Sequence, residues 1–145
     1  MIRIARTALF LAALSAAALS PPALAQELGA GDREAIRAVI ERQIAAFRRD
    51  DAAAAFSFAS PAIRERFQTP ARFMEMVREG YRPVYRPRSV EFQEIHLLQG
   101  EPVQQVLVLD PEGAPVIALY FMERQPDGSW RINGCQLLRP RGDSI

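Results

Sequence analysis

Three short turn-forming segments divide the second half of the chain into four stretches typical of β-strands. The stretches are rich in apolar and β-branched residues and cover 89–98, 103–110, 115–124 and 129–139. The segments between them (99–102, 111–114 and 125–128) combine proline with Gly100, Gly113 or Gly128, as tight turns do. Connections this short cannot join parallel strands. The pattern therefore predicts a four-stranded antiparallel meander.

The region before the strands has the period of helices. Apolar side chains recur at the three-four spacing of one helix face, at Ile36, Val39, Ile40, Ile44 and Phe47, with Gln43 on the same face. This face predicts a first helix that begins at Asp32, whose side chain is expected to cap it.

Cap signals divide the rest of this region into three further helices. Asp50-Asp51 predicts the start of a helix over 52–59. Ser60 and Thr69 each precede a proline, a pattern typical of an N-cap, and predict helices over 63–67 and 70–79. Gly80 is expected to be a C-cap, and the residues over 82–88, which include two prolines, are expected to be extended.

Helices over about 32–81, followed by strands over about 89–139, predict a single α+β domain with its helices on one face of the sheet. Residues 1–25 are expected to precede this domain, over 26–145, as a cleaved signal peptide. They combine Arg3 and Arg6, an apolar run over 8–19 and the small-x-small pattern of 23–25. An uncleaved membrane anchor is the alternative, although the run is short for a span. The expected location is the periplasm or the exterior, reached by bacterial Sec-type export and without membrane attachment after cleavage.

The charged residues exclude several classes of function. All 18 basic residues are arginines, so neither a Schiff-base lysine nor a phosphate-binding lysine loop is available. Removal of Arg3 and Arg6 would leave 16 basic and 17 acidic residues, a net charge of about −1. A chain so nearly neutral is not expected to bind nucleic acid.

The predicted strands are apolar on both sides, whereas a sheet with one wet face alternates apolar and polar residues. Ile117, Leu119 and Phe121 alternate with apolar residues that would face the helices. This favours a homodimer formed through the second face; shielding by strand twist and long arginines is the alternative. Cys135, the only cysteine, is expected to be a buried inert thiol or, on the same face as Ile117, an intersubunit disulfide.

His96 is the only histidine and does not predict a metal site. With Glu94 two positions away on the same strand face, it is a candidate general base, and Tyr85 or Tyr120 would then polarise the substrate. A structural histidine is the alternative. No cofactor is expected.

Arginine and aromatic residues alternate where the helices give way to the strands. Tyr81, Arg82, Tyr85, Arg86 and Arg88 are candidates for binding an anion, because guanidinium groups beside rings can clamp carboxylates or phosphates. The alternative is a stiff linker that leads the chain into the sheet.

Several segments resemble the bacterial family known as domain of unknown function 4864: 43–51, 55–61, 76–81, 85–87 and 127–134, the last reading Asp127-Gly128-Ser129-Trp130. The resemblance implies an exported protein related to the nuclear-transport-factor-2-like superfamily, whose α+β cone fold carries isomerases, dehydratases, ligand binders and dimerisation modules. It supplies no catalytic residues. The chain lacks the extra hairpin usual between the early helices of that superfamily, and fold alone does not give activity.

These patterns favour a non-catalytic module that binds a small molecule or a protein partner. The alternative is a cofactor-independent lyase or isomerase that would use the candidates named above. Such an enzyme needs convergent polar groups and a perturbed ionisable residue inside an apolar cavity.

Overall fold

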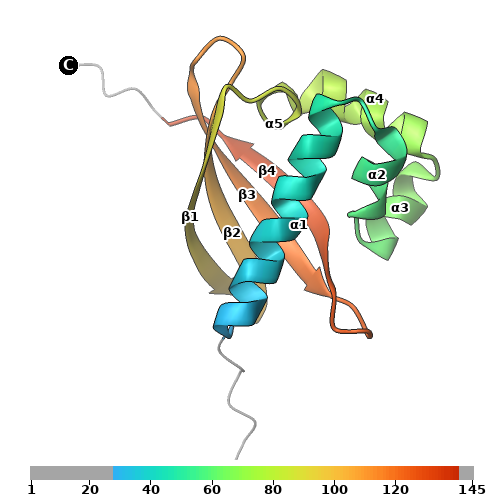
Figure 1. The fold of residues 1–145 in the computed structure, drawn as a ribbon, viewed down its shortest axis with the longest axis vertical. Coiled ribbons are helices and arrows are strands. Elements are labelled where there is room, and N and C mark those ends of the chain that lie inside the picture. Colours follow the sequence, from blue (N-terminus) through green and yellow to red (C-terminus); the bar gives the residue numbers. More distant parts are fainter. Residues whose placement is uncertain (1–27, 141–145) are drawn as a thin grey trace, which may run out of the picture.

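The computed structural model describes residues 28–140, so the predicted signal peptide over 1–25 lies outside the described residues. Helices come first and strands follow (Figure 1). The helices are α1 (Ala30–Arg48), α2 (Ala52–Ser57), α3 (Pro61–Phe67), α4 (Pro70–Gly80) and α5 (Arg82–Tyr85). The strands are β1 (Ser89–Leu98), β2 (Glu101–Leu109), β3 (Pro115–Arg124) and β4 (Trp130–Leu138). No helix within 28–140 combines the length and apolar character needed to cross a membrane.

The strands form one antiparallel sheet in the order β1-β2-β3-β4, which confirms the predicted meander. The first hairpin turns in only two residues. Gln99 and Gly100 both have positive φ values, 51° and 83°, as a type I′ turn requires and as the right-handed twist of the strands favours. Because the turn is so short, β2 begins at Glu101, two residues before its predicted start.

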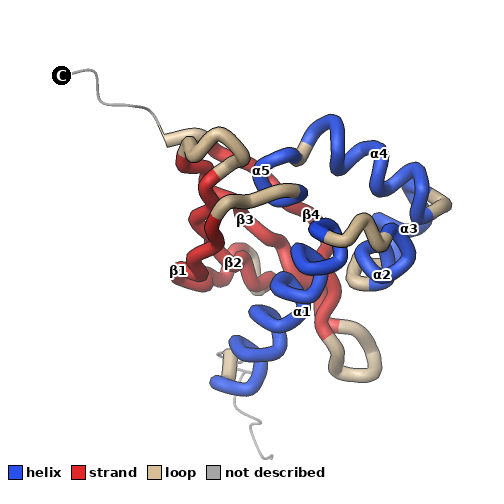
Figure 2. The backbone as a smooth tube through the Cα atoms, turned by 45° about the horizontal axis from the view of Figure 1, so that its top comes forward, coloured by secondary structure: helices blue, strands red, loops and turns tan. Residues whose placement is uncertain are grey.

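The helices lie on one side of the sheet, as Figure 2 shows, and α1 crosses the sheet face. The predicted face of α1 is buried: Ile36 and Ile40 are fully buried and Phe47 is 2% exposed. They pack in one core with sheet residues such as Val106 and Ala118. Helices on one face of an antiparallel sheet are the α+β class that the sequence predicts.

Three predicted N-caps are confirmed. The Asp51 side chain accepts a hydrogen bond from the Ala54 amide, and Ser60 and Thr69 cap α3 and α4 in the same way. In both α3 and α4 a proline follows the cap, where its missing N–H leaves no helical bond unmade.

Two predicted caps are wrong. α1 begins at Ala30 with Gly29 as its N-cap, and Asp32 lies in the first turn, where its carboxylate accepts hydrogen bonds from the side chains of Arg124 and Trp130. Gly80 is the last residue of α4, and Tyr81 is the C-cap. Gly29 makes no side-chain cap hydrogen bond, and Tyr81 differs from the predicted C-cap by one position.

The prediction of extended chain over 82–88 is also wrong in its first half. Residues Arg82–Tyr85 form the short helix α5. Pro83 is at its start, where the fixed φ of proline suits a helix and no N–H is needed. The two prolines therefore act differently, because the chain leaves the helical conformation only before Pro87.

Candidate functional site

A cavity of about 380 Å³ lies between the helices and the β3–β4 half of the sheet. This volume is within the range typical of small-molecule sites. Much of the wall is apolar and comes from α3, α4, α5 and the sheet: Ile63, Phe67, Phe73, Met76, Val77, Val84 and Ile132. The polar and charged groups that also line it are Gln43, Arg66, Tyr81, Tyr120, Asn133 and Cys135.

Tyr120 forms part of the sheet wall of this cavity. It is in the middle of β3 and alternates with Ala118 and Met122 on the face that packs against the helices. Its side chain is 1% exposed, and its hydroxyl has no hydrogen-bond partner among the described residues. A buried hydroxyl without a partner costs stability. Burial raises the pKa of Tyr120 well above its usual value, so the hydroxyl is neutral at physiological pH and can donate a hydrogen bond.

Cys135 lies next to Tyr120 and not on the outer face where it was predicted. The two residues are opposite each other in the β3–β4 register, so their side chains share a face. The pairing shifts between Phe121 and Met122, where Gly134 and Ile132 are the partners and Asn133 is the extra residue of a bulge. One extra residue reverses the alternation of faces. Burial raises the pKa of the Cys135 thiol to about 12.

This placement corrects the assignment of Cys135 to the predicted dimer interface with Ile117, Leu119 and Phe121. The thiol lines the cavity beneath the helices, on the side of the sheet opposite Ile117, Leu119 and Phe121. The alternative prediction, an inert thiol, agrees with its raised pKa, because the thiolate is the reactive form.

The helical wall of the cavity is attached to the edge of the sheet. The Ser60 amide donates to the carbonyl of Ile132 at 2.8 Å, and the Ile132 amide donates to the carbonyl of Phe58 at 2.9 Å. The Ser60 hydroxyl also donates to the Asn133 side chain at 2.8 Å. These bonds give partners to backbone groups of Ile132 at the free edge of β4 beside the cavity, and they fix the start of α3 relative to that strand.

Gln43 is a cavity residue whose role the sequence reasoning missed. It was assigned to the apolar face of α1, and it is 3% exposed. Its side-chain amide donates to the Ala55 carbonyl at 3.2 Å, which ties α1 to α2. A polar side chain within an otherwise apolar helix stripe was the available signal, because such a residue must find a partner when buried.

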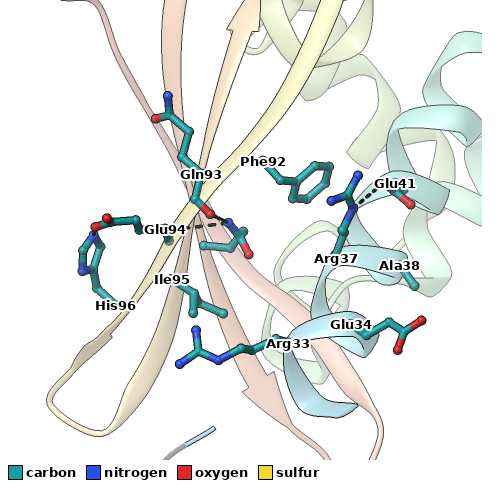
Figure 3. A pocket seen from close by; sticks show the side chains of 11 residues that line it. Arg33, Glu34, Arg37, Ala38, Glu41, Phe92, Gln93, Glu94, Ile95 and His96 are labelled. Atoms are coloured by element: carbon teal, nitrogen blue, oxygen red, sulfur yellow. Dashed lines mark hydrogen bonds and ion pairs between the residues drawn. The ribbon is translucent and has the colours of Figure 1, made fainter. Parts of the chain in front are cut away.

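A larger groove, of about 830 Å³, lies between α1 and β1, and Figure 3 shows its residues. Charged side chains such as Arg33, Glu34 and Arg37 line it from α1. Arg37 pairs with Glu41 at 2.8 Å. The groove is therefore open and polar, unlike the cavity beside Tyr120.

His96 belongs to this groove and not to the cavity. Its side chain is 58% exposed and lies 3.6 Å from the carboxylate of Glu94, which confirms the expected pairing of these two residues. Figure 3 shows both side chains on the side of β1 away from α1. No residue of the groove lining is shared with the cavity that contains Tyr120. The candidate base and the candidate polarising tyrosine are therefore not brought together.

Asp50 binds two residues of the arginine-aromatic segment, Tyr85 and Arg86, together with Arg78 of α4. Tyr85 donates its hydroxyl hydrogen to the Asp50 carboxylate, and Arg86 and Arg78 reach the same carboxylate at 2.9 and 3.4 Å. Arg86 also donates to the Phe47 carbonyl and lies 4.0 Å from the centre of the Tyr85 ring. The hydrogen bond from Tyr85, aided by both arginines, lowers the pKa of Asp50. The sequence reasoning assigned Asp50 only to a helix cap.

The other anion-binding candidates do not converge with this cluster. Arg82 pairs with Glu112 at 3.4 Å. The Arg88 guanidinium lies beside Gly113, whose φ of 85° favours glycine at that position. Tyr81 lines the cavity. The structure thus gives the segment the arrangement of a brace between α1, α4 and the sheet, with a carboxylate of the chain itself as its anion.

The outer face of the sheet carries the remaining candidates. Ile117, Leu119 and Phe121 lie on the side opposite Tyr120 and are partly exposed. Leu138, which pairs with Ile117, is 42% exposed. Phe121 packs over Gly134: a Cβ atom placed at Gly134 would lie 3.7 Å from Cδ2 of the Phe121 ring. The three predicted interface residues other than Cys135 therefore share one apolar surface.

Comparisons with known proteins address the family and not the site. The family model described as "Domain of unknown function (DUF4864)" matches residues 30–145. No curated protein is similar enough to match the chain. Among solved structures, ActVI-ORFA from Streptomyces coelicolor is similar at 13% sequence identity with a TM-score of 0.48, over 79% of this chain and 99% of that chain. Because the family model spans most of its length, the chain belongs to the DUF4864 family.

Proposed function

We propose that this chain is an exported, non-catalytic protein that binds a small, largely apolar molecule in the cavity beside Tyr120. The observation that carries the proposal is Tyr120, a residue of the cavity wall whose buried hydroxyl has no hydrogen-bond partner among the described residues. A ligand that accepts its hydrogen bond would compensate for the cost of burying it.

The same residues favour binding over catalysis. General acid–base catalysis works best with a group whose pKa is near the working pH. Burial moves the pKa of both Tyr120 and Cys135 upward, away from neutrality. His96, the residue best suited by type, lines the other groove. A lyase or isomerase in this cavity would lack a base.

We also propose that the protein forms a homodimer through the outer face of the sheet. Leu119, Phe121 and Leu138 give that face an apolar surface, and the helices cover only the opposite face. Pairing two such faces would remove both from water at once, which is the isologous arrangement most common among dimers. Each sheet would then be covered on both sides.

Native mass spectrometry of the protein purified from its own periplasm tests these proposals together. We expect a dimer of chains that begin after residue 25, each retaining one small molecule that is released on denaturation. A ligand-free protein from several independent preparations would contradict the binding function and favour a protein-interaction module. A chain that keeps residues 1–25 would contradict cleavage and export in the proposed form.

Two tyrosine variants localise the binding. Tyr120→Phe removes the hydroxyl from the cavity, whereas Tyr85→Phe removes one from the Asp50 cluster outside it. We expect the first variant to lose the retained ligand and the second to keep it. Equal retention by both would show that the ligand does not contact Tyr120.

A further inference from the structure

The cavity lining combines polar, apolar and charged side chains. Its most buried polar groups, Tyr120 and Gln43, are uncharged, as is the partly buried Cys135. Aromatic and aliphatic side chains of α3 and α4 also line the cavity, among them Phe67, Phe73 and Met76. The single charged residue of the lining is Arg66 of α3.

Arg66 is exposed, and within residues 28–140 it makes no ion pair. Its guanidinium lies 5.7 Å from the centre of the Phe67 ring, which holds it over an aromatic side chain of the same wall. Many other arginines of the chain are engaged by carboxylates, as Arg78, Arg82 and Arg86 are. A guanidinium left without an anion at the rim of a cavity is a site for a carboxylate, which matches its geometry.

The buried polar groups of the cavity favour an uncharged group of the ligand, whereas Arg66 favours a charged one. The side-chain amide of Gln43 already donates to the Ala55 carbonyl, whereas the Tyr120 hydroxyl has only the weakly accepting Cys135 thiol beside it and no hydrogen bond of normal geometry among the described residues. An ionised group there would be buried without a counter-charge, at high cost. The inner end of the ligand must therefore be an uncharged oxygen that accepts a hydrogen bond.

We infer that the cavity takes an amphiphilic carboxylic acid: an elongated apolar molecule with a neutral carbonyl oxygen against Tyr120 and its carboxylate at Arg66. This inference rests on the proposed binding function and adds the class and the orientation of the ligand. Both ends of the molecule are recognised by a named group, and the aromatic wall between them fits a ring system.

Three related probes test each end separately: para-acetylbiphenyl, para-biphenylcarboxylic acid and the molecule that bears both groups at opposite ends. Their dissociation constants for the mature protein are measured by titration calorimetry. We expect the doubly substituted probe to bind most tightly. Tyr120→Phe should weaken both acetyl compounds about tenfold, the loss of one buried hydrogen bond, and leave the simple acid unchanged. Arg66→Gln should weaken both acids about threefold and leave acetylbiphenyl unchanged.

Arg64→Gln is the matched control for the rim. Arg64 is a neighbouring exposed arginine of α3 that stacks on Phe56 and does not line the cavity, so this variant should keep the preference for acids. Arg66→Lys should keep most of it, because the charge remains.

The outcomes separate the two proposals. If acetylbiphenyl binds in a manner that depends on Tyr120 but the carboxylate adds nothing, or adds the same in Arg66→Gln, the inference about ligand class is overturned and the binding function stands. If none of the three probes binds, the inference about ligand class is overturned, and the binding function is overturned as well only when native mass spectrometry also finds no retained ligand. The inference is supported only when each substitution affects the probes that carry its own partner group.

Discussion

The two faces of the sheet are made from alternate residues of the same strands, yet they have different environments. On the inner face Val108, Val116 and Met122 are at most 1% exposed under the helices. On the outer face their sequence neighbours Leu107, Ile117 and Phe121 are apolar as well but remain partly exposed. Composition alone does not distinguish the two faces. The difference lies in what covers them, because the helices cover only one.

The inner face is itself divided. At its centre Val106 and Ala118 pack with Ile36 and Ile40 of α1, whereas towards β1 it borders the polar groove and beside Tyr120 and Cys135 it borders the cavity. A close-packed interior leaves few spaces of this size. The inner face thus combines a filled core with hollows beside it, whereas the outer face, where Leu119 lies between Gln105 and Gln136, is not covered by any helix of residues 28–140. The predictions below test this contrast.

The largest expected effect is the loss of a filled inner position. Met122→Ala should lower the free energy of unfolding by about 2–5 kcal/mol, because it removes a buried side chain and leaves a void. Leu119→Ala, on the outer face, should cost about 1 kcal/mol or less in the monomer. Urea denaturation at a protein concentration low enough to keep the chain monomeric measures both.

Equal losses at the two positions would contradict the assignment of faces. A larger loss for Leu119→Ala that appears only at high protein concentration would instead show that the outer face is buried between subunits, because dimer stability depends on concentration.

A charge on the outer face should break the proposed dimer directly. Leu119→Arg should raise the dissociation constant at least about 30-fold, the cost of losing about 2 kcal/mol at an interface centre. Light scattering across a dilution series measures this change. Glu75→Arg, on the exposed surface of α4, is the control and should not alter assembly. A wild-type protein that is monomeric at every concentration would exclude the dimer.

Removing the Tyr120 hydroxyl should change the free energy of unfolding less than Met122→Ala does, and it should not lower it. Tyr120→Phe loses no protein hydrogen bond in the described structure, so the free energy of unfolding should stay the same or rise by about 1 kcal/mol. Tyr85→Phe breaks a bond to Asp50 and should lower it by about 1 kcal/mol. Thermal unfolding of the ligand-free proteins compares them. Destabilisation by Tyr120→Phe would indicate a partner for this hydroxyl within the protein.

Local signals explain why much of the fold could be predicted from the sequence. The hairpin at Gln99-Gly100 and the caps at Asp51, Ser60 and Thr69 depend on residues only a few positions apart. Such short-range chemistry can be read directly, and it fixes the order and the direction of the strands. The apolar face of α1 then identifies the side on which the sheet is covered.

The site was harder to predict because it depends on contacts between distant residues. The bulge at Asn133 reverses the face of Cys135; the neighbouring Gly134, a glycine inside a strand, was the only local signal for it. Asp50 meets Tyr85 and Arg86 more than 30 residues further along the chain, so the anion of the arginine-aromatic segment is visible only once α1 and α5 are packed together. Tyr120 was a candidate by residue type, but its missing partner is a property of the packed structure.

Thiol labelling compares the inner and outer faces of the sheet with almost no change in stability. Native Cys135 should react very slowly with iodoacetamide at neutral pH, because it faces the cavity and its pKa of about 12 leaves almost no thiolate. A cysteine at the exposed outer position Leu138, introduced as Leu138→Cys with Cys135→Ser, should react at least about 100-fold faster in the dilute protein. In denaturant the two thiols should react at the same rate, which controls for their intrinsic reactivity with iodoacetamide. Fast labelling of native Cys135, or its recovery in an intersubunit disulfide, would place it on the outer face and refute the bulge that pairs it with Tyr120.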